Sequence, residues 1–85
     1  MAVDITTLGI LSDTETRSIF ELVVKLKNAR LDMLLKKLDT DDQASVIIHL
    51  GRLQNVGLID EKRSTLPEWN KYFVTADGLE AIRKI

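Results

Sequence analysis

The chain has 85 residues, no cysteine, and 12 lysines and arginines against 13 aspartates and glutamates, which gives a formal net charge of -1. This length predicts one small domain that folds alone, and the lack of cysteine excludes a disulfide framework, a thiolate metal site and a cysteine nucleophile. The balanced charge excludes a general attraction to nucleic acid, so binding of that kind would need a local basic patch.

The sequence shows no repeat, low-complexity tract or internal linker, which predicts a single domain over residues 1–85. Residues 1–11 are too apolar for a solvated tail. We expect this N-terminal arm to pack on the core of residues 12–85 or on a second copy of the chain. Neither a secretory segment nor a long apolar run is visible, so we expect a cytoplasmic protein that makes no contact with a membrane.

The first helix is expected over residues 13–28. Its start fits a capping box, in which the Ser12 hydroxyl accepts from the Glu15 backbone N–H and the Glu15 carboxylate reaches back. The residues that follow have the spacing i, i+3, i+4 and i+7 of one apolar helix stripe: Ile19, Leu22, Val23 and Leu26.

A brief second helix and a longer third helix come next. The second has an apolar stripe at the same spacing, made of Leu31, Leu34, Leu35 and Leu38. It ends in a turn suited to capping the next helix, at Asp39, Thr40, Asp41 and Asp42. The third helix is expected over residues 42–55, with Gly57 as its left-handed stop and a buried stripe of Val46, Leu50 and Leu53.

Two strands and a last helix complete the chain. Residues 58–63 and 71–75 predict a strand pair joined by a loop over residues 64–70. In that loop Trp69 either contacts a partner or folds back onto the domain. Thr75 is expected to cap a final helix whose inward-facing residues are Leu79, Ile82 and Ile85.

This order of elements, with the segment HLGRLQNVGLI and the later YFVTADG, resembles small winged helix-turn-helix transcriptional regulators of the arsenic-repressor, multiple-antibiotic-repressor and PadR kinds. The similarity covers about residues 13–85 and is most specific at His49-Leu50, Gly57-Leu58-Ile59 and Val74-Thr75. The resemblance implies an α+β winged helix-turn-helix fold, with a three-helix core, a two-stranded β-hairpin wing and a C-terminal helix. It also implies a homodimer that binds double-stranded DNA.

In such regulators the third helix enters the major groove and the wing contacts the backbone. The resemblance therefore places five residues on the groove-facing side of that helix: Gln43, Ala44, Ser45, Ile48 and Arg52. By their chemistry Gln43 would pair with adenine, Ala44 would contact a thymine methyl, and Arg52 would bind phosphate or guanine. The residues expected near phosphate are Lys36, Lys37, Lys62, Arg63 and Lys71.

A second hypothesis is a winged-helix protein-interaction module that does not bind DNA. Ile48 offers only apolar contact, and the aspartates before the third helix place negative charge where phosphates would run. An exposed aliphatic side chain beside the small residues Ala44, Ser45 and Gly51 would suit a protein partner. The two hypotheses differ in whether a basic stripe runs from the second helix to the wing.

No enzymatic motif is visible. The sequence lacks a nucleophile elbow, a phosphate-binding glycine loop and a zinc-protease helix, which predicts a protein that is not an enzyme and needs no cofactor. His49 is the single histidine, and without cysteine partners it cannot build the usual metal site. We interpret it as a packed, hydrogen-bonded helix residue and expect no metal.

Overall fold

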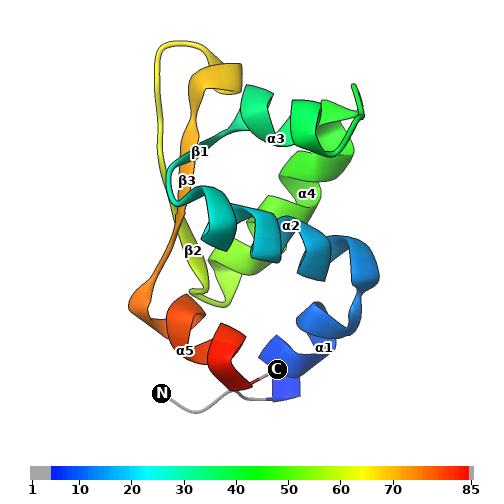
Figure 1. Cartoon of the computed structure of the whole chain (residues 1–85), viewed down its shortest axis with the longest axis vertical. Helices are drawn as coiled ribbons and strands as arrows, with labels where there is room; N and C mark the ends of the chain where they lie inside the picture. The colour runs from blue at the N-terminus through cyan, green and yellow to red at the C-terminus, as the bar shows by residue number, and fades with distance from the viewer. Residues whose placement is uncertain (1–4, 85) are drawn as a thin grey trace.

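The computed structural model describes residues 5–84, which form an α+β arrangement of five α-helices, one short 3-10 helix and a three-stranded antiparallel sheet (Figure 1). The elements in chain order are α1 (Ile5–Ser12), α2 (Thr14–Leu26), β1 (Ala29–Arg30), α3 (Leu31–Lys37), α4 (Gln43–Asn55), β2 (Ile59–Lys62), η1 (Pro67–Trp69), β3 (Lys71–Val74) and α5 (Ala76–Lys84). Over this described range no helix has both the length and the apolar composition needed to cross a membrane.

The predicted capping box at Ser12 is wrong. Residues 5–11 of the expected arm form a helix that runs on to Ser12, so Ser12 lies in the last turn of α1 and its hydroxyl donates to the Leu8 carbonyl at 2.8 Å. Asp13 separates the two helices and α2 begins at Thr14. The arm does pack on the core, as expected, because Leu11 is buried.

The helices α3 and α4 lie where the apolar spacing predicts them. Asp42 precedes α4 and its side chain accepts from the Ser45 backbone N–H at 3.2 Å, which satisfies one of the free donors of the first turn. After α4 the chain turns at Gly57, whose φ of 80° lies in the left-handed region that favours glycine. Both of these sequence predictions are confirmed.

The sheet has one strand more than predicted. β2 and β3 form the expected antiparallel pair, and β1 pairs with the other side of β3 to give the order β1-β3-β2. The two-stranded hairpin prediction is corrected to three strands, since β1 is only two residues long and has no alternating pattern that a sequence could show. This third strand joins α2 to the sheet through Ala29, which is fully buried opposite Tyr72.

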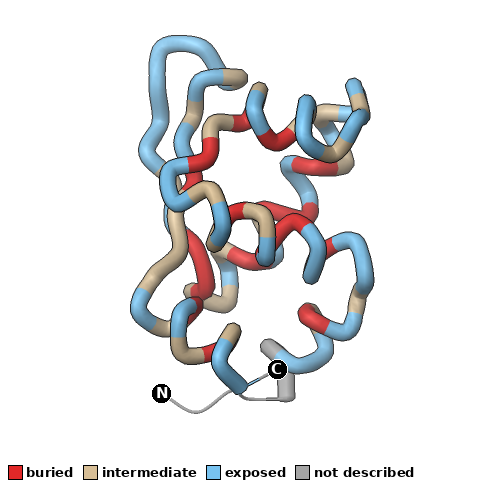
Figure 2. Tube along the Cα trace, viewed as in Figure 1, coloured by how far each residue is buried: buried red, intermediate tan, exposed pale blue. Residues whose placement is uncertain are grey.

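The core lies between α2, α4 and the inner face of the sheet, where the buried stretches of the chain converge (Figure 2). The residues of the three apolar stripes predicted for the first three helices are all buried or packed against the core. Leu79 is a correction, because it is 45% exposed and α5 instead turns Gly78 and Ala81 inward. The inward placement expected for Ile85 falls outside the described residues.

The start of α5 is fixed by Thr75 and Gly78. The Thr75 hydroxyl accepts from the Gly78 backbone N–H at 3.0 Å, as the predicted cap requires, and also donates to the Gly57 carbonyl. A Cβ on Gly78 would lie 2.1 Å from the Leu58 carbonyl oxygen, so only glycine permits this approach. The first turn of α5 is therefore held against the turn that follows α4.

Candidate nucleic-acid interface

The exposed face of α4 is mostly apolar. At about 100° per residue, Ala44, Ile48 and Arg52 lie within roughly 80° of one another and point to solvent. Ile48 is 58% exposed, and Ile47 beside it is 41% exposed. Of the five residues predicted to face the groove, Ala44, Ile48 and Arg52 thus share one exposed face. The side chain at its centre, Ile48, is aliphatic.

Gln43 and Ser45 lie to either side of this face. Gln43 is rotated by roughly 140° from Ile48 and is half-buried. Ser45 is rotated by roughly 60° in the opposite sense and lines a cleft of about 370 Å³ between α2 and α4. One DNA groove therefore cannot contact both Gln43 and Ser45, although the sequence resemblance implies that it would.

Arg52 is held toward the start of α2. Its Nη1 atom lies 3.6 Å from Asp13 Oδ2, and its side chain is about half exposed. The hydrogen bond from the Thr16 hydroxyl, followed by the charges of His49 and Arg52, lowers the pKa of Asp13 below its ordinary value of 3.8. A ligand that binds Arg52 would therefore compete with a carboxylate of the same chain.

His49 lies in the same cluster as Asp13, Thr16 and Arg52, and its side chain is buried. Its Nδ1 atom lies 2.8 Å from Thr16 Oγ1, and its Nε2 atom lies 3.0 Å from Glu15 Oε2. The ring is 9% exposed, which agrees with the interpretation of a packed, hydrogen-bonded helix residue. Within residues 5–84 no group of three or more histidine, aspartate or glutamate side chains is placed to hold a metal ion.

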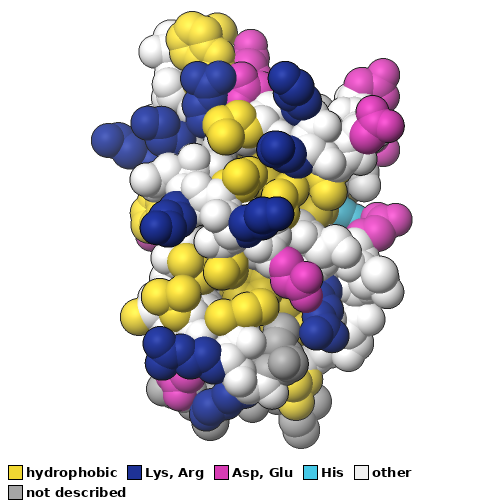
Figure 3. All heavy atoms as spheres, in the orientation of Figure 1, with side chains coloured by type: hydrophobic (Ala, Val, Ile, Leu, Met, Phe, Trp, Pro, Cys, Tyr) yellow, Lys and Arg dark blue, Asp and Glu magenta, His cyan; other side chains and the backbone are white. Residues whose placement is uncertain are grey.

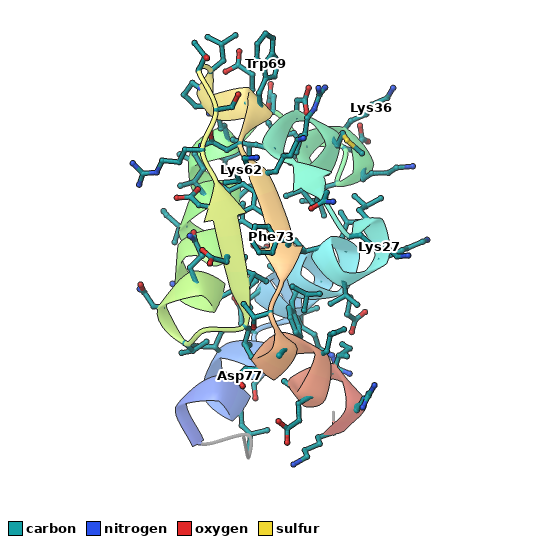
Figure 4. The ribbon with its side chains drawn as sticks, turned by 90° about the vertical axis from the view of Figure 1, so that its left-hand side faces the viewer. Lys27, Lys36, Lys62, Trp69, Phe73 and Asp77 are labelled. Atoms are coloured by element: carbon teal, nitrogen blue, oxygen red, sulfur yellow. The ribbon has the colours of Figure 1, made fainter. Side chains whose placement is uncertain are left out.

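The strands divide the predicted wing cations between two faces. Lys62 and Lys71 are direct cross-strand partners, and Lys71 is also opposite Arg30 on β1. Because directly opposite residues share a face, these three cations form a row across the outer face of the sheet. Figure 4 shows Lys62 on this side of the sheet, with Phe73 further along β3. Arg63 follows β2 and lines a groove of about 460 Å³ against α4 instead.

Carboxylates of the chain offset part of this row: Asp32 binds Arg30, and Asp60 lies on the same face of β2, two residues before Lys62. Arg30 is held by Asp32 through two hydrogen bonds of 3.0 and 2.7 Å. Lys62 and Lys71 are exposed, and among residues 5–84 neither has an ion-pair partner. Like charges placed directly opposite in a sheet are destabilising, so the row gains stability when an external anion binds.

Three further lysines extend the positive charge beyond the sheet. Lys27 follows α2, Lys36 and Lys37 end α3, and all three are exposed with no ion-pair partner in the described part of the chain. We define the lysine surface as these residues with the row: Lys27, Arg30, Lys36, Lys37, Lys62 and Lys71. Figure 3 shows several lysine and arginine side chains over the upper and middle part of one face, with acidic side chains at the right-hand edge and a few others near the top and the centre.

This lysine surface includes a residue that sequence reasoning did not select. Lys27 was not predicted as a site residue, because its neighbourhood depends on β1 and its register with β3. The predicted set of exposed residues on α4 contains Ile48 but not its neighbour Ile47. For Ile47 a signal existed, since a position about 100° from Ile48 is still far from the buried stripe of α4.

Comparison with known proteins identifies no relative: no protein-family model, curated protein or solved structure matches this chain.

Proposed function

We propose that this chain is a winged helix-turn-helix domain that binds double-stranded DNA as a transcriptional regulator in the cytoplasm. The order α2, β1, α3, α4, β2, β3 and the sheet order β1-β3-β2 support the fold assignment, together with the sequence resemblance. In this proposal the hairpin of β2 and β3 is the wing. The lysine surface supplies the contacts with phosphate.

The observation that carries the proposal is the row Arg30, Lys71 and Lys62. Asp32 holds Arg30, whereas Lys62 and Lys71 are exposed and have no ion-pair partner among residues 5–84. These two lysines therefore stay available to an external anion, and Lys36 and Lys37 add exposed positive charge at the end of α3. A regularly charged polyanion such as DNA is the partner that this arrangement suits.

We expect phosphate contacts to supply most of the affinity. On the exposed face of α4 only Arg52 and Asn55 have side chains able to hydrogen-bond to base edges. Ala44, Ile47 and Ile48 could meet thymine methyl groups and nothing else. The proposal therefore implies modest sequence preference and a strong dependence of binding on salt.

The test is fluorescence anisotropy of the protein with a mixed-sequence DNA duplex at several salt concentrations between about 50 and 200 mM. Each lost phosphate contact lowers the salt slope of log K by about 0.9, so Lys62→Ala with Lys71→Ala should lower it by about 2. Arg83→Ala is the matched control, because Arg83 is an exposed cation of α5 outside the lysine surface. An unchanged slope in the double variant would overturn the assigned contacts.

The second candidate function is a protein-interaction module that does not bind DNA. The exposure of Ile47 and Ile48 on α4 favours it, since two neighbouring aliphatic side chains on a helix suit a protein surface. The same titration separates the two candidates. Folded protein that fails to bind DNA at about 50 mM salt would leave the interaction module as the better account.

A further inference from the structure

The exposed side of α4 has an apolar centre that the chain itself does not cover. Ile47 and Ile48 are 41% and 58% exposed, and the small residues Ala44 and Gly51 lie one turn before and after them. A Cβ on Gly51 would meet nothing within 4 Å. Glycine is unfavourable inside a helix, and nothing in the fold of a single chain requires it at this position.

Charge is distributed unequally along the same side of the helix. Asp39, Asp41 and Asp42 are exposed at the N-terminal end of α4, whereas Arg52 is about half exposed on its C-terminal half. Arg52 lies 3.6 Å from Asp13 of its own chain, so a second copy must draw it away from this carboxylate. Such a surface complements itself when two copies of the helix run antiparallel. Arg52 of each copy then approaches the acidic end of the other, as an interface with two-fold symmetry requires.

Helix geometry supports this pairing. With a two-fold axis through Ile48 and a rise of 1.5 Å per residue, Arg52 lies about 6 Å from the axis, opposite Ala44 of the second copy. Asp42 caps the helix two residues before Ala44 and Asp41 precedes it, so this acidic end lies on the side that Arg52 of the other copy approaches. A parallel pair would instead place the two acidic ends together.

The neighbouring groove adds surface to this contact. Ile47, Gly51 and Gln54 line one wall of the groove of about 460 Å³, and Arg63 and Pro67 lie on the other side. Stable interfaces bury about 1,200 Å² or more in total, which the exposed stripe of one helix pair does not supply alone. Side chains of the second copy can enter the groove on either side of the axis.

We propose that α4 forms the interface between two copies of this chain, packed antiparallel about Ile48. This inference does not depend on the DNA proposal. It uses the same face of α4 that the DNA proposal offers to base edges, so in this dimer only the lysine surface remains for DNA. In Figure 4, α4 lies on the side of the molecule opposite Lys27 and Lys36. A dimer of this kind leaves both lysine surfaces uncovered and doubles the number of phosphate contacts available.

Sedimentation equilibrium over a range of concentrations tests the proposal. We expect the wild-type chain to dimerise and Ile48→Asp to raise the dimer dissociation constant by at least about tenfold, because it buries a charge at the centre of the interface. Leu79→Asp is the matched control, since Leu79 is 45% exposed on α5 and should leave the constant unchanged. A monomeric wild type, or a dimer whose dissociation constant is unchanged by Ile48→Asp, overturns the proposal.

Two further variants keep the test decisive if Ile48→Asp is poorly folded. Gly51→Leu has open space on the monomer and should keep the circular dichroism spectrum of the fold while preventing close approach of the helices. Arg52→Asp should weaken the dimer, and adding Asp41→Arg to it should restore the wild-type constant. Failure of this charge exchange to restore dimerisation contradicts antiparallel packing.

Discussion

The hydroxyl of Thr16 joins Asp13 to His49: it donates to Asp13 Oδ2 at 2.6 Å and lies 2.8 Å from His49 Nδ1. Thr16 is fully buried, so no water replaces it when it is removed. The contact ties the first turn of α2 to the middle of α4. It is the main polar link between the two helices that form the core.

We expect Thr16→Val to destabilise the fold by about 1–3 kcal/mol, because it keeps the side-chain shape and removes the hydroxyl bonded to both Asp13 and His49, which leaves His49 Nδ1 only the longer contact of 3.5 Å with Asp13. Urea denaturation followed by circular dichroism measures the change. Thr14→Val is the control, since Thr14 lies exposed in the same first turn and should alter stability by less than about 0.5 kcal/mol. Equal effects of the two variants would show that the buried link contributes nothing.

The same link predicts a loss of stability in acid. The Thr16 hydrogen bond and the nearby charges of His49 and Arg52 lower the pKa of Asp13 in the folded chain. A carboxyl whose pKa is lower in the folded state stabilises the fold fully above its ordinary value of 3.8 and loses this contribution as the pH falls through the folded pKa. We expect Asp13→Asn to flatten the acid limb of the curve of unfolding free energy against pH. An identical acid limb in the variant would exclude this role.

The helices of the core could be predicted because apolar spacing alone specifies them. The sequence places α4 within one residue, since its cap, its buried stripe and its glycine stop all agree. Ser12 and Leu79 show where local patterns fail. The cap at Ser12 competes with a helix that precedes it, and the inward face of α5 is set by the contact of Gly78 with the Leu58 carbonyl.

The candidate interface was less predictable, because it depends on strand register. Lys62 and Arg63 are adjacent in sequence, yet alternation along the strand turns them to opposite sides of the hairpin. The row that contains Lys62 becomes visible only when Lys71 is known to face both it and Arg30. No spacing rule in the sequence brings these three residues together.

The single tyrosine provides a test of burial in the sheet. Tyr72 is 3% exposed, and burial, followed by the charge of Glu61, raises its pKa to about 12 from an ordinary value of 10.0. The fold therefore keeps its full contribution from this group below pH 10.0 and loses it as the pH rises through about 12. Ultraviolet titration of the tyrosinate should show this delayed transition.

Glu61→Gln separates the two causes of this shift. The variant removes the charge opposite Tyr72 but leaves the ring buried, so the pKa should fall part of the way toward its ordinary value. Glu68→Gln, in the loop between the strands, is the control and should leave the titration unchanged. A full return to the ordinary pKa in Glu61→Gln would mean that burial is not the main cause.

Two glycine-to-alanine changes should have opposite signs. Gly78→Ala places a Cβ 2.1 Å from a backbone oxygen that cannot move away without disturbing β2, and we expect a loss of about 3 kcal/mol or more. Gly51→Ala enters open space inside α4, where alanine is favoured over glycine by up to about 1 kcal/mol. Urea denaturation at low protein concentration, where the monomer dominates, measures both changes. A destabilising Gly51→Ala would show that the helix is constrained at this position within the monomer, which contradicts the open space described here.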